Sequence, residues 1–327
     1  MTREDTLPRL KLIIIGTQKR SLEDVKCYSD MWMLHLCSAF QSLGVELVFH
    51  RGYKPDEDPK AFADSVISMV KITTPAAILS PGVRDFTRIP LTIGGRLRNL
   101  AGVPVTQIYD GSLLDSAPVD LTFTVRDDAW KFQDDKHRLA RHQRYNKYVG
   151  WAADRSLFYP EKKHHGQLRI FIDHAAFDVS GFDHSLTIMM NLRQLSAMGV
   201  SFVARTLTDE GIADVDPENI CLKPYRRNGV SAIEFAAELR QADIFIVTHP
   251  ESLGLTVLEA AMCGALVLTP DHCIAPDRLQ LVNHQVITSK IDWAKALVAV
   301  DREANAERVA GFTWEAVAGN IISILNK

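Results

Sequence analysis

The sequence predicts an α/β protein with two lobes that face a cleft, each lobe built on a doubly wound parallel sheet. Short apolar runs alternate with segments of helical periodicity, which is typical of parallel strands joined by helices. The same alternation restarts near the middle of the chain. The length of 327 residues fits about two domains of ordinary size.

The first half begins with the apolar run LKLIIIG at 10–16, which predicts a buried strand that ends at a glycine. A helix is predicted over 28–43, because apolar residues recur there at the spacing of one helix face. Gly44 follows directly and is typical of a helix end. Four further strands are predicted from the apolar runs at 45–50, 75–80, 103–110 and 119–125.

The second half repeats this order of elements. Strands are predicted at 168–175, 200–206, 243–250 and 265–270, and helices at 184–199, 230–242, 253–264 and 291–300. The segment 148–167 between the halves contains proline, paired lysines and paired histidines, with little periodicity, so the lobe boundary is placed there. Two Rossmann-like lobes are therefore expected at 1–150 and 151–312. Such folds bind ligands at the carboxyl ends of their strands.

Composition excludes several classes of function. The net charge of −3 argues against extended nucleic-acid binding, which usually requires a basic surplus. Neither lobe opens with G-x-G-x-x-G, so a nicotinamide-dependent enzyme is disfavoured. The cysteines are odd in number and form no C-x-x-C pair, which disfavours a disulfide framework or a zinc site and fits a reducing cytoplasm; they are Cys27, Cys37, Cys221, Cys263 and Cys273.

The ends and apolar runs of the chain bear on its location. The N-terminal stretch MTREDTLPRL is charged and has no apolar core, so no secretory signal is expected. No apolar run approaches the roughly 18 residues needed to span a bilayer. We therefore expect a cytoplasmic protein, either soluble or attached to the inner face of the membrane.

Two carboxylates bracket an otherwise apolar segment, ESLGLTVLEAAMCGALVL at 251–268. Glu251 is expected in the turn after a buried strand, at the carboxyl edge of the sheet, and Glu259 about two turns into the following helix. Gly254 would let a ligand approach the backbone closely, and the first amides of the helix suit a phosphate. Chance could give this spacing of two glutamates, but a purely structural helix has little reason to bury one. The segment predicts a site for a nucleotide sugar.

This segment resembles the E-x7-E signature of retaining glycosyltransferases with the GT-B fold, of the large family-four type. YVGWAADRSLFYP at 148–160 is similar to that family's interdomain segment, and ELRQADIFIVT at 238–248 to the stretch before the signature. FTWEAVAGNIISIL at 312–325 resembles its terminal helix, which implies that 313–327 cross back to the first lobe. The resemblance is strong over 148–327 and only topological over 1–147.

The resemblance also implies roles for individual residues. Glu251 would contact the donor hexose near the reacting carbon, and Glu259 would hold the ribose hydroxyls. The backbone of Gly254 and Leu255 would face the sugar and the diphosphate, and Thr248 would line the donor site from the strand end. The family transfers sugar with retained configuration and without an obligatory metal, so neither a metal nor a cofactor is expected. The first lobe would bind the acceptor.

The sequence departs from the family where the leaving phosphates are usually neutralised. The stretch 171–186 contains neither lysine nor arginine, and offers His174 instead. Candidate substitutes are Arg205, Lys223, Arg226 and Arg227, although for any single one of them a solvated surface charge is the favoured interpretation. In the first lobe, Asp110 is a candidate for binding an acceptor hydroxyl or a simple turn former, and Gly16 is a candidate for lining the site.

Three hypotheses about function follow. The leading one is a hexosyltransferase that builds a surface glycan or glycoconjugate of bacterial type. The second is a catalytically weakened protein of the same fold that binds glycan or nucleotide, or serves as a subunit. The third is a sugar-nucleotide epimerase. The basic, aromatic-containing stretch 130–148 is either a contact with an anionic membrane that carries a lipid-linked acceptor or a solvated helix face.

Overall fold

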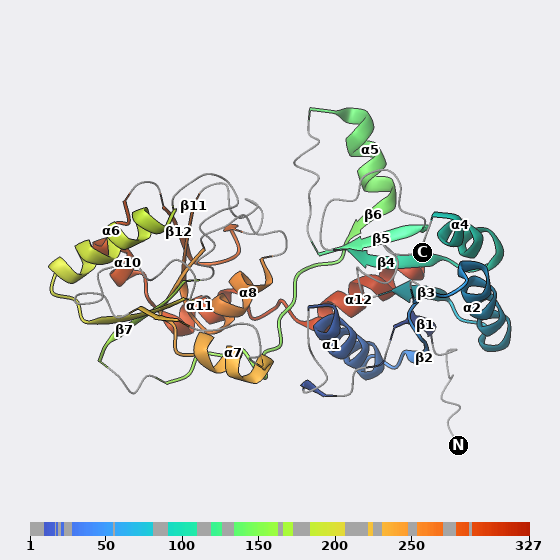
Figure 1. The fold of residues 1–327 in the computed structure, drawn as a ribbon, viewed down its shortest axis with the longest axis horizontal. Helices are drawn as coiled ribbons and strands as arrows, with labels where there is room; N and C mark the ends of the chain where they lie inside the picture. The colour runs from blue at the N-terminus through green and yellow to red at the C-terminus, as the bar shows by residue number, and fades with distance from the viewer. Residues whose placement is uncertain are drawn as a thin grey trace, which may run out of the picture. The chain divides into compact units, whose positions relative to one another are not determined.

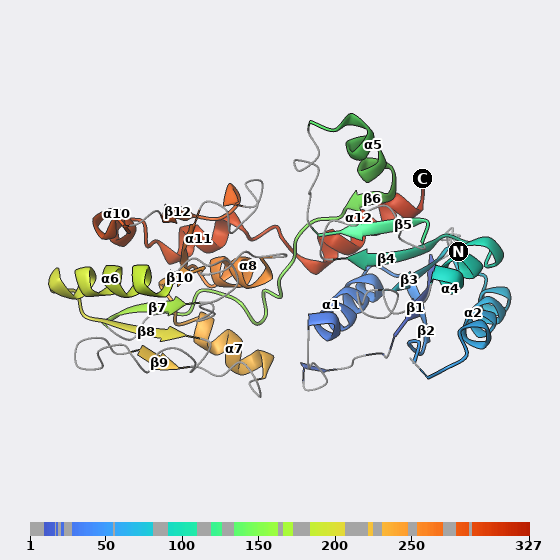
Figure 2. The same ribbon diagram turned by 45° about the horizontal axis from the view of Figure 1, so that its top comes forward.

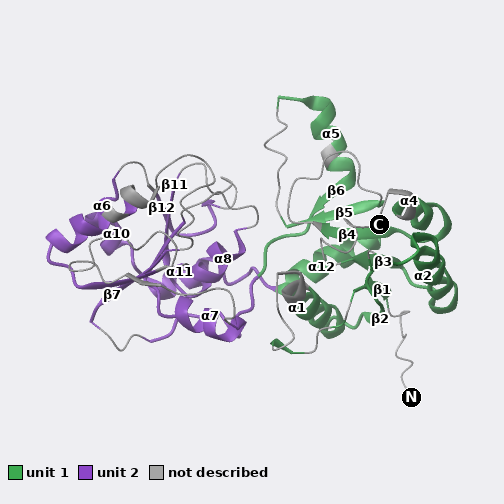
Figure 3. Ribbon diagram, viewed as in Figure 1, with its two compact units in different colours: residues 1–152, 314–327 green, residues 153–313 purple. Residues whose placement is uncertain are grey.

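The computed structural model describes most of the chain, and all statements below concern the described residues. These are 10–16, 18, 21–22, 28–54, 56–80, 91–109, 119–125, 134–162, 166–172, 184–206, 222–224, 231–247, 254–270, 279–287 and 290–327. The chain divides into two compact units (Figure 3). The first lobe comprises Met1–Ala152 and Trp314–Lys327, and the second lobe comprises Ala153–Thr313.

The first lobe contains a six-stranded sheet in the order β2-β1-β3-β4-β5-β6, and every neighbouring pair is parallel. Its strands are β1 (Lys11–Ile15), β2 (Glu46–His50), β3 (Ala77–Ser80), β4 (Val105–Tyr109), β5 (Leu121–Thr124) and β6 (Asn146–Tyr148). Its helices are α1 (Tyr28–Ser42), α2 (Pro59–Thr73), α4 (Leu91–Leu100), α5 (Lys136–Tyr145) and α12 (Trp314–Leu325).

Helices cover both faces of this sheet. An apolar cluster joins α2 and α4 to one face, with Phe62 and Leu97 packed against Ile13 and Ile78. On the other face α1 and α12 lie side by side, as Figures 1 and 2 both show. Because each sheet face is buried, the strands read as continuous apolar runs rather than alternating ones.

The second lobe contains another six-stranded parallel sheet, in the order β12-β11-β10-β7-β8-β9. Its strands are β7 (Leu168–Ile172), β8 (Phe202–Thr206), β9 (Leu222–Pro224), β10 (Ile244–Ile246), β11 (Leu266–Pro270) and β12 (His284–Ile287). Its helices are α6 (His184–Ala197), α7 (Ala232–Leu239), α8 (Leu255–Met262), α10 (Trp293–Val298) and α11 (Arg302–Arg308).

The strand order of the second lobe reverses between β7 and β10. From β7 the chain moves outward through β8 to β9, and it then returns to β10 and proceeds through β11 to β12. In doubly wound sheets, ligands bind at the carboxyl ends of the strands on either side of such a reversal. β10 is one of the two strands at this reversal, and α8 is the next described helix along the chain.

The predicted fold class of two parallel α/β lobes is confirmed. The helix predicted before Gly44 ends at Ser42, and Gly44 itself has a φ of 80°. The helices α2 and α11 and the short strands β6, β9 and β12 were not among the predicted elements. Within the part of the chain that the structure describes, no helix is both long and apolar enough to cross a membrane.

Candidate functional site

The helix α8 is the next described element after a strand that flanks the reversal of the second sheet. It follows β10, whose three residues are all buried, and starts at Leu255 after an N-cap glycine. Gly254 has φ 62° and ψ 29°, a left-handed conformation that glycine adopts at little cost. A glycine N-cap contributes no side-chain acceptor to the first amides of the helix. Those amides suit an anionic group that approaches the helix start.

All eight residues of α8 are buried, including its one charged side chain, Glu259. That side chain is only 8% exposed, among Val257, Leu258, Ala260 and Ala261 that are at most 1% exposed. A carboxylate removed from water to this degree is costly unless other groups compensate. Burial raises the pKa of the nearby Cys263 thiol, and the charge of Glu259 adds to that rise. The structure therefore places Glu259 in the apolar helix that the sequence predicted.

Three of the residues expected at the donor site lie outside the described residues, namely His174, Thr248 and Glu251. Gly254, Leu255 and Glu259 lie together on α8, with Leu255 3% exposed. The roles of all six residues remain predictions. What the structure adds is the position of α8, directly after the central strand β10.

The two candidate phosphate-neutralising cations lie on neighbouring strands. Arg205 of β8 and Lys223 of β9 are Cα partners in the sheet register. The guanidinium of Arg205 forms an ion pair with the carboxylate of Glu238 on α7, and both side chains are partly buried. β7 separates β8 from β10, so Arg205 lies about 10 Å from the β10 backbone.

In the first lobe, Gly16 follows β1 with a φ of 141°, where a residue with a side chain is strained. Its amide nitrogen donates a 2.8 Å hydrogen bond to the carbonyl oxygen of His50, which ties the ends of β1 and β2 together. Asp110 lies outside the described residues. Arg96, in α4, donates from Nε to the Asp64 carboxylate of α2 at 2.9 Å.

A row of buried polar side chains crosses the first sheet, and the sequence did not indicate it. Ser80, Gln107, Thr122 and Asn146 are successive Cα partners on β3, β4, β5 and β6. All four side chains are buried, and the Gln107 amide donates to the Thr122 hydroxyl at 3.3 Å. In-register residues of parallel strands share one sheet face. Only the register reveals this row, because the four residues lie far apart in the sequence.

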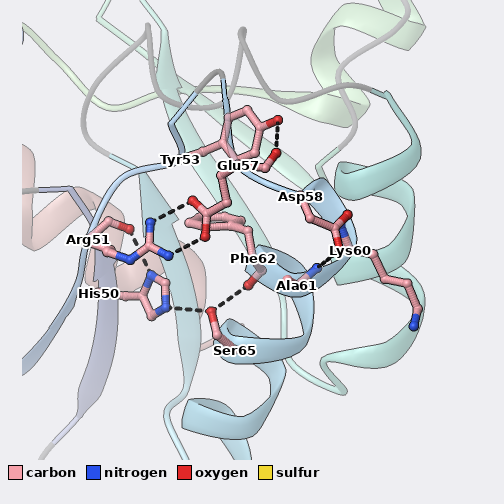
Figure 4. A network of polar contacts seen from close by, with 9 residues as sticks. All are labelled: His50, Arg51, Tyr53, Glu57, Asp58, Lys60, Ala61, Phe62 and Ser65. Atoms are coloured by element: carbon pink, nitrogen blue, oxygen red, sulfur yellow. Dashed lines mark hydrogen bonds and ion pairs between the residues drawn. The ribbon is translucent and has the colours of Figure 1, made fainter.

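A second polar cluster lies where β2 leads into α2 (Figure 4). The Nδ1 atom of His50 lies 2.8 Å from the Arg51 carbonyl oxygen, and its Nε2 atom lies 3.0 Å from the Ser65 hydroxyl. The Arg51 guanidinium holds the Glu57 carboxylate through both of its terminal nitrogens. Burial lowers the pKa of His50, whereas the hydrogen bonds from Arg51 lower that of Glu57.

Within the described ranges, no group of three or more histidine, cysteine or carboxylate side chains is arranged to hold a metal ion. The expectation of a reaction without an obligatory metal therefore remains a prediction that requires a functional test.

No protein-family model matches the chain, and no curated protein matches it in sequence. Solved structures do match it in fold. A glycosyltransferase from Rickettsia africae ESF-5 aligns with a TM-score of 0.70 and 10% identity, over 98% of both chains. HepE from Anabaena, solved with UDP and glucose, aligns with a TM-score of 0.61 and 12% identity, over 97% of this chain and 100% of that one.

The third comparison is with a protein assigned as a UDP-N-acetylglucosamine 2-epimerase from Listeria monocytogenes. It aligns with a TM-score of 0.59 and 13% identity, over 97% of this chain and 96% of that one. At such low identity the matches establish architecture rather than activity. They show that this chain has the two-lobed GT-B fold that these glycosyltransferases share.

Proposed function

We propose that the chain is a glycosyltransferase that moves a hexose-type sugar from a nucleotide-sugar donor to a glycan or glycoconjugate acceptor, with retained configuration. The observation that carries this proposal is the buried carboxylate of Glu259 on α8. This helix starts after the left-handed Gly254 and follows β10, a strand at the strand-order reversal of the second lobe. The fold shared with glycosyltransferases supports it, as does HepE, which was solved with UDP and glucose.

The donor would bind at the carboxyl edge of the second sheet. Glu259 would accept hydrogen bonds from the two ribose hydroxyls, and the diphosphate would meet the amides at the start of α8. Thr248 and His174, from the two strand ends that flank the reversal, would complete the pocket. Arg205 and Lys223 would supply positive charge once Arg205 exchanges its contact with Glu238 for the phosphate.

The chemistry replaces one bond at the anomeric carbon. The bond to the diphosphate oxygen breaks and its electron pair leaves with the diphosphate, while a bond to an acceptor oxygen forms on the same face. The acceptor hydroxyl gives up its proton, which an oxygen of the leaving diphosphate would accept. Glu251 would lie near the reacting carbon and stabilise the positive charge that develops there. Rate enhancement would come mainly from orienting the acceptor and from stabilising the leaving diphosphate. Acceptor contacts would come from the first lobe, with Asp110 and Gly16 as candidates.

The first test is nucleotide binding measured by thermal shift. UDP, GDP, ADP and dTDP are added separately, and one of them should raise the Tm. At a concentration of about 100 Kd, the stabilisation is about 2.7 kcal/mol, which corresponds to several degrees. Glu259→Ala and Glu259→Gln should abolish the shift relative to their own ligand-free Tm. Glu307→Ala, which changes an exposed carboxylate of the same lobe, should keep it.

The second test is turnover. With the accepted donor, Glu251→Ala should lower kcat by about a hundredfold or more while the ligand-free Tm stays near that of wild type. An excess of EDTA should leave the rate unchanged if no metal is needed. An unaltered rate in Glu251→Ala would remove this residue from the proposed active site.

Two alternative functions have specific support. A nucleotide-binding protein without transferase activity is favoured by the absence of lysine and arginine from 171–186. It would show the thermal shift but release no sugar with any acceptor. A sugar-nucleotide epimerase is favoured by the fold match to the Listeria protein. It would convert the donor sugar without an acceptor, and NMR of the sugar nucleotide would show this directly.

We also propose that the enzyme acts in the cytoplasm and contacts the inner membrane face through α5. Arg138, Arg141 and Arg144 recur at every third position of this helix, and all three are exposed. The described part of α5 has no buried residue and extends from β6 in the first lobe (Figure 1). Near an anionic surface each such charge contributes about 1 kcal/mol.

Sedimentation with phosphatidylglycerol-containing vesicles tests this contact. Changing the three arginines to glutamine should weaken binding by about a hundredfold, from a loss of about 3 kcal/mol. Changing Lys60 and Lys71, two exposed lysines of α2, to glutamine serves as the control. Equal sedimentation of both variants would contradict the assignment of the membrane contact to α5.

A further inference from the structure

The carboxyl end of α8 is held by α11 through a set of contacts that the proposed reaction does not use. Arg302, the first residue of α11, donates from one terminal nitrogen to the carbonyl oxygen of Cys263 at 3.0 Å. The same nitrogen also donates to the carbonyl oxygen of Arg240, just after α7. Arg302 therefore joins the carboxyl ends of two helices, where a positive charge is favoured by the helix dipole.

The other terminal nitrogen of Arg302 faces a buried carboxylate. It lies 3.6 Å from Asp243, whose side chain is fully buried, while that of Arg302 is 11% exposed. Asp243 in turn accepts a 2.8 Å hydrogen bond from the Arg169 amide at the start of β7. Burial lowers the pKa of Arg302, and the charge of Asp243 opposes that effect. The guanidinium thus connects both helix ends to the amino edge of the central strands.

Gly264 and Asn305 complete the contact. Gly264 has a φ of 88°, and a Cβ atom at this position would lie 2.4 Å from the Arg302 carbonyl oxygen. The glycine therefore lets α11 approach α8 more closely than any side chain would permit. The amide of Asn305, which is 2% exposed, donates to the Gly264 carbonyl oxygen at 3.0 Å. Asn305 also accepts from the amide of Asn283 at 2.6 Å.

We propose that Arg302 and Asn305 are positioning residues for the donor site, because they fix α8 at the end opposite to its ligand-binding start. The helix has eight residues and is therefore about 12 Å long. With all its side chains packed in the core, it moves as a rigid rod. A shift at Cys263 and Gly264 is transmitted along this rod to Glu259 and Gly254. The role in ligand binding rests on the proposed function, whereas the fixing of α8 does not.

The variants Arg302→Lys and Asn305→Ala test this inference with little risk to the fold. Lysine keeps a positive charge opposite Asp243, but its ammonium cannot reproduce the planar fork that reaches two carbonyls and a carboxylate. Asn305→Ala removes one donor from the Gly264 carbonyl. Asn191→Ala is the matched control. Asn191 is also 2% exposed in the second lobe, but its amide oxygen accepts from the Ile291 amide, which is not part of α8.

Two measurements are made on the 327-residue chain in native buffer. Hydrogen exchange followed by mass spectrometry reports on peptides that cover 254–264, and needs no ligand. In Arg302→Lys and Asn305→Ala, the α8 amides should exchange about tenfold faster, whereas Asn191→Ala should leave them as in wild type even if its Tm falls as far. The Kd of the nucleoside diphosphate identified by thermal shift should rise about tenfold in the first two variants only.

The possible outcomes separate this inference from the proposed function. Unchanged exchange over 254–264 in both variants would show that α11 does not fix α8. Faster exchange with an unchanged Kd would show that the contact is structural and does not position the donor site. If wild-type protein binds none of UDP, GDP, ADP and dTDP, the proposed function fails, and the exchange comparison alone decides whether α11 holds the helix.

Discussion

The Nε2 atom of His50 lies 3.0 Å from the hydroxyl oxygen of Ser65, joining the end of β2 to the second turn of α2. The same hydroxyl donates to the Phe62 carbonyl oxygen at 2.7 Å, and Nδ1 of the imidazole faces the Arg51 carbonyl. Figure 4 shows the imidazole enclosed between these groups. The Arg51 carbonyl oxygen can only accept, so a neutral ring donates to it through Nδ1. The Nε2 atom must then accept the single Ser65 hydroxyl proton, for which the Phe62 carbonyl oxygen competes.

This arrangement predicts a pH-dependent stability. Burial lowers the pKa of His50 below its ordinary 6.5. At a pH between the pKa of the folded protein and that of the unfolded chain, the unfolded chain therefore binds more protons than the folded one. The contribution of neutral His50 to the free energy of unfolding should therefore be fully present above about pH 6.5. It should be lost as the pH falls toward and through the pKa that His50 has in the folded protein. Urea denaturation at pH 7.5 and 5.5 measures the difference, and His50→Gln should reduce it. A difference of the same size in the variant would assign the pH dependence to other groups.

Gly264→Ala should cost about 3 kcal/mol of unfolding free energy. It combines a left-handed backbone with a Cβ atom 2.4 Å from the backbone of Arg302. Gly199→Ala is a matched control, since its φ is 75° but nothing lies within 4 Å of the added carbon. That variant should lose only about 1 kcal/mol, from backbone strain alone. The unfolding free energy of both variants is measured by denaturant titration. Equal losses would mean that α11 can move away from α8 at no cost in stability.

The crossing helix α12 should contribute strongly to the first lobe. Ile321 is fully buried within it, so Ile321→Ala should cost about 2–5 kcal/mol. Ile72→Ala removes the same atoms from a side chain that is 82% exposed on α2, and should change stability by no more than about 0.5 kcal/mol. Thermal unfolding of both variants tests this, and similar Tm values would contradict the buried position of α12.

The thiols of Cys37 and Cys263 should be unreactive in the native protein. Burial raises the pKa of Cys37 to about 12 and that of Cys263 further still, so almost no thiolate exists at pH 8. Alkylation with iodoacetamide followed by peptide mapping should label these two positions only after denaturant is added. Rapid labelling of Cys263 in native protein would indicate that the end of α8 opens.

The sequence allowed the sheets to be predicted because their strands are buried on both faces. Runs such as that at β1 contain apolar residues without interruption, and this signal does not depend on partners. The three-residue strands β6 and β9 are too short to show any periodicity. The helix α2 carried usable signals in Asp58 and Pro59, an N-cap and a first-turn proline, that the sequence analysis did not use.

The candidate site could be predicted only where its residues lie in one continuous segment of the sequence. Glu259 could be placed because its own neighbours in the sequence are apolar, which implied a buried carboxylate. The Arg205–Glu238 ion pair and the contact of Arg302 with Asp243 each join residues that are far apart in the sequence. Such pairs depend on strand register and helix packing, and these form only in the folded chain. The polar row at Gln107 is another example, since the sheet register alone aligns it.

The first lobe is assembled from two separate stretches of chain, with α12 following the whole of the second lobe. The second lobe is therefore synthesised before α12, the helix that packs against α1. The contact between α1 and α12 can form only after residues 153–313 have been synthesised, whereas the second lobe is continuous in sequence and needs no later segment.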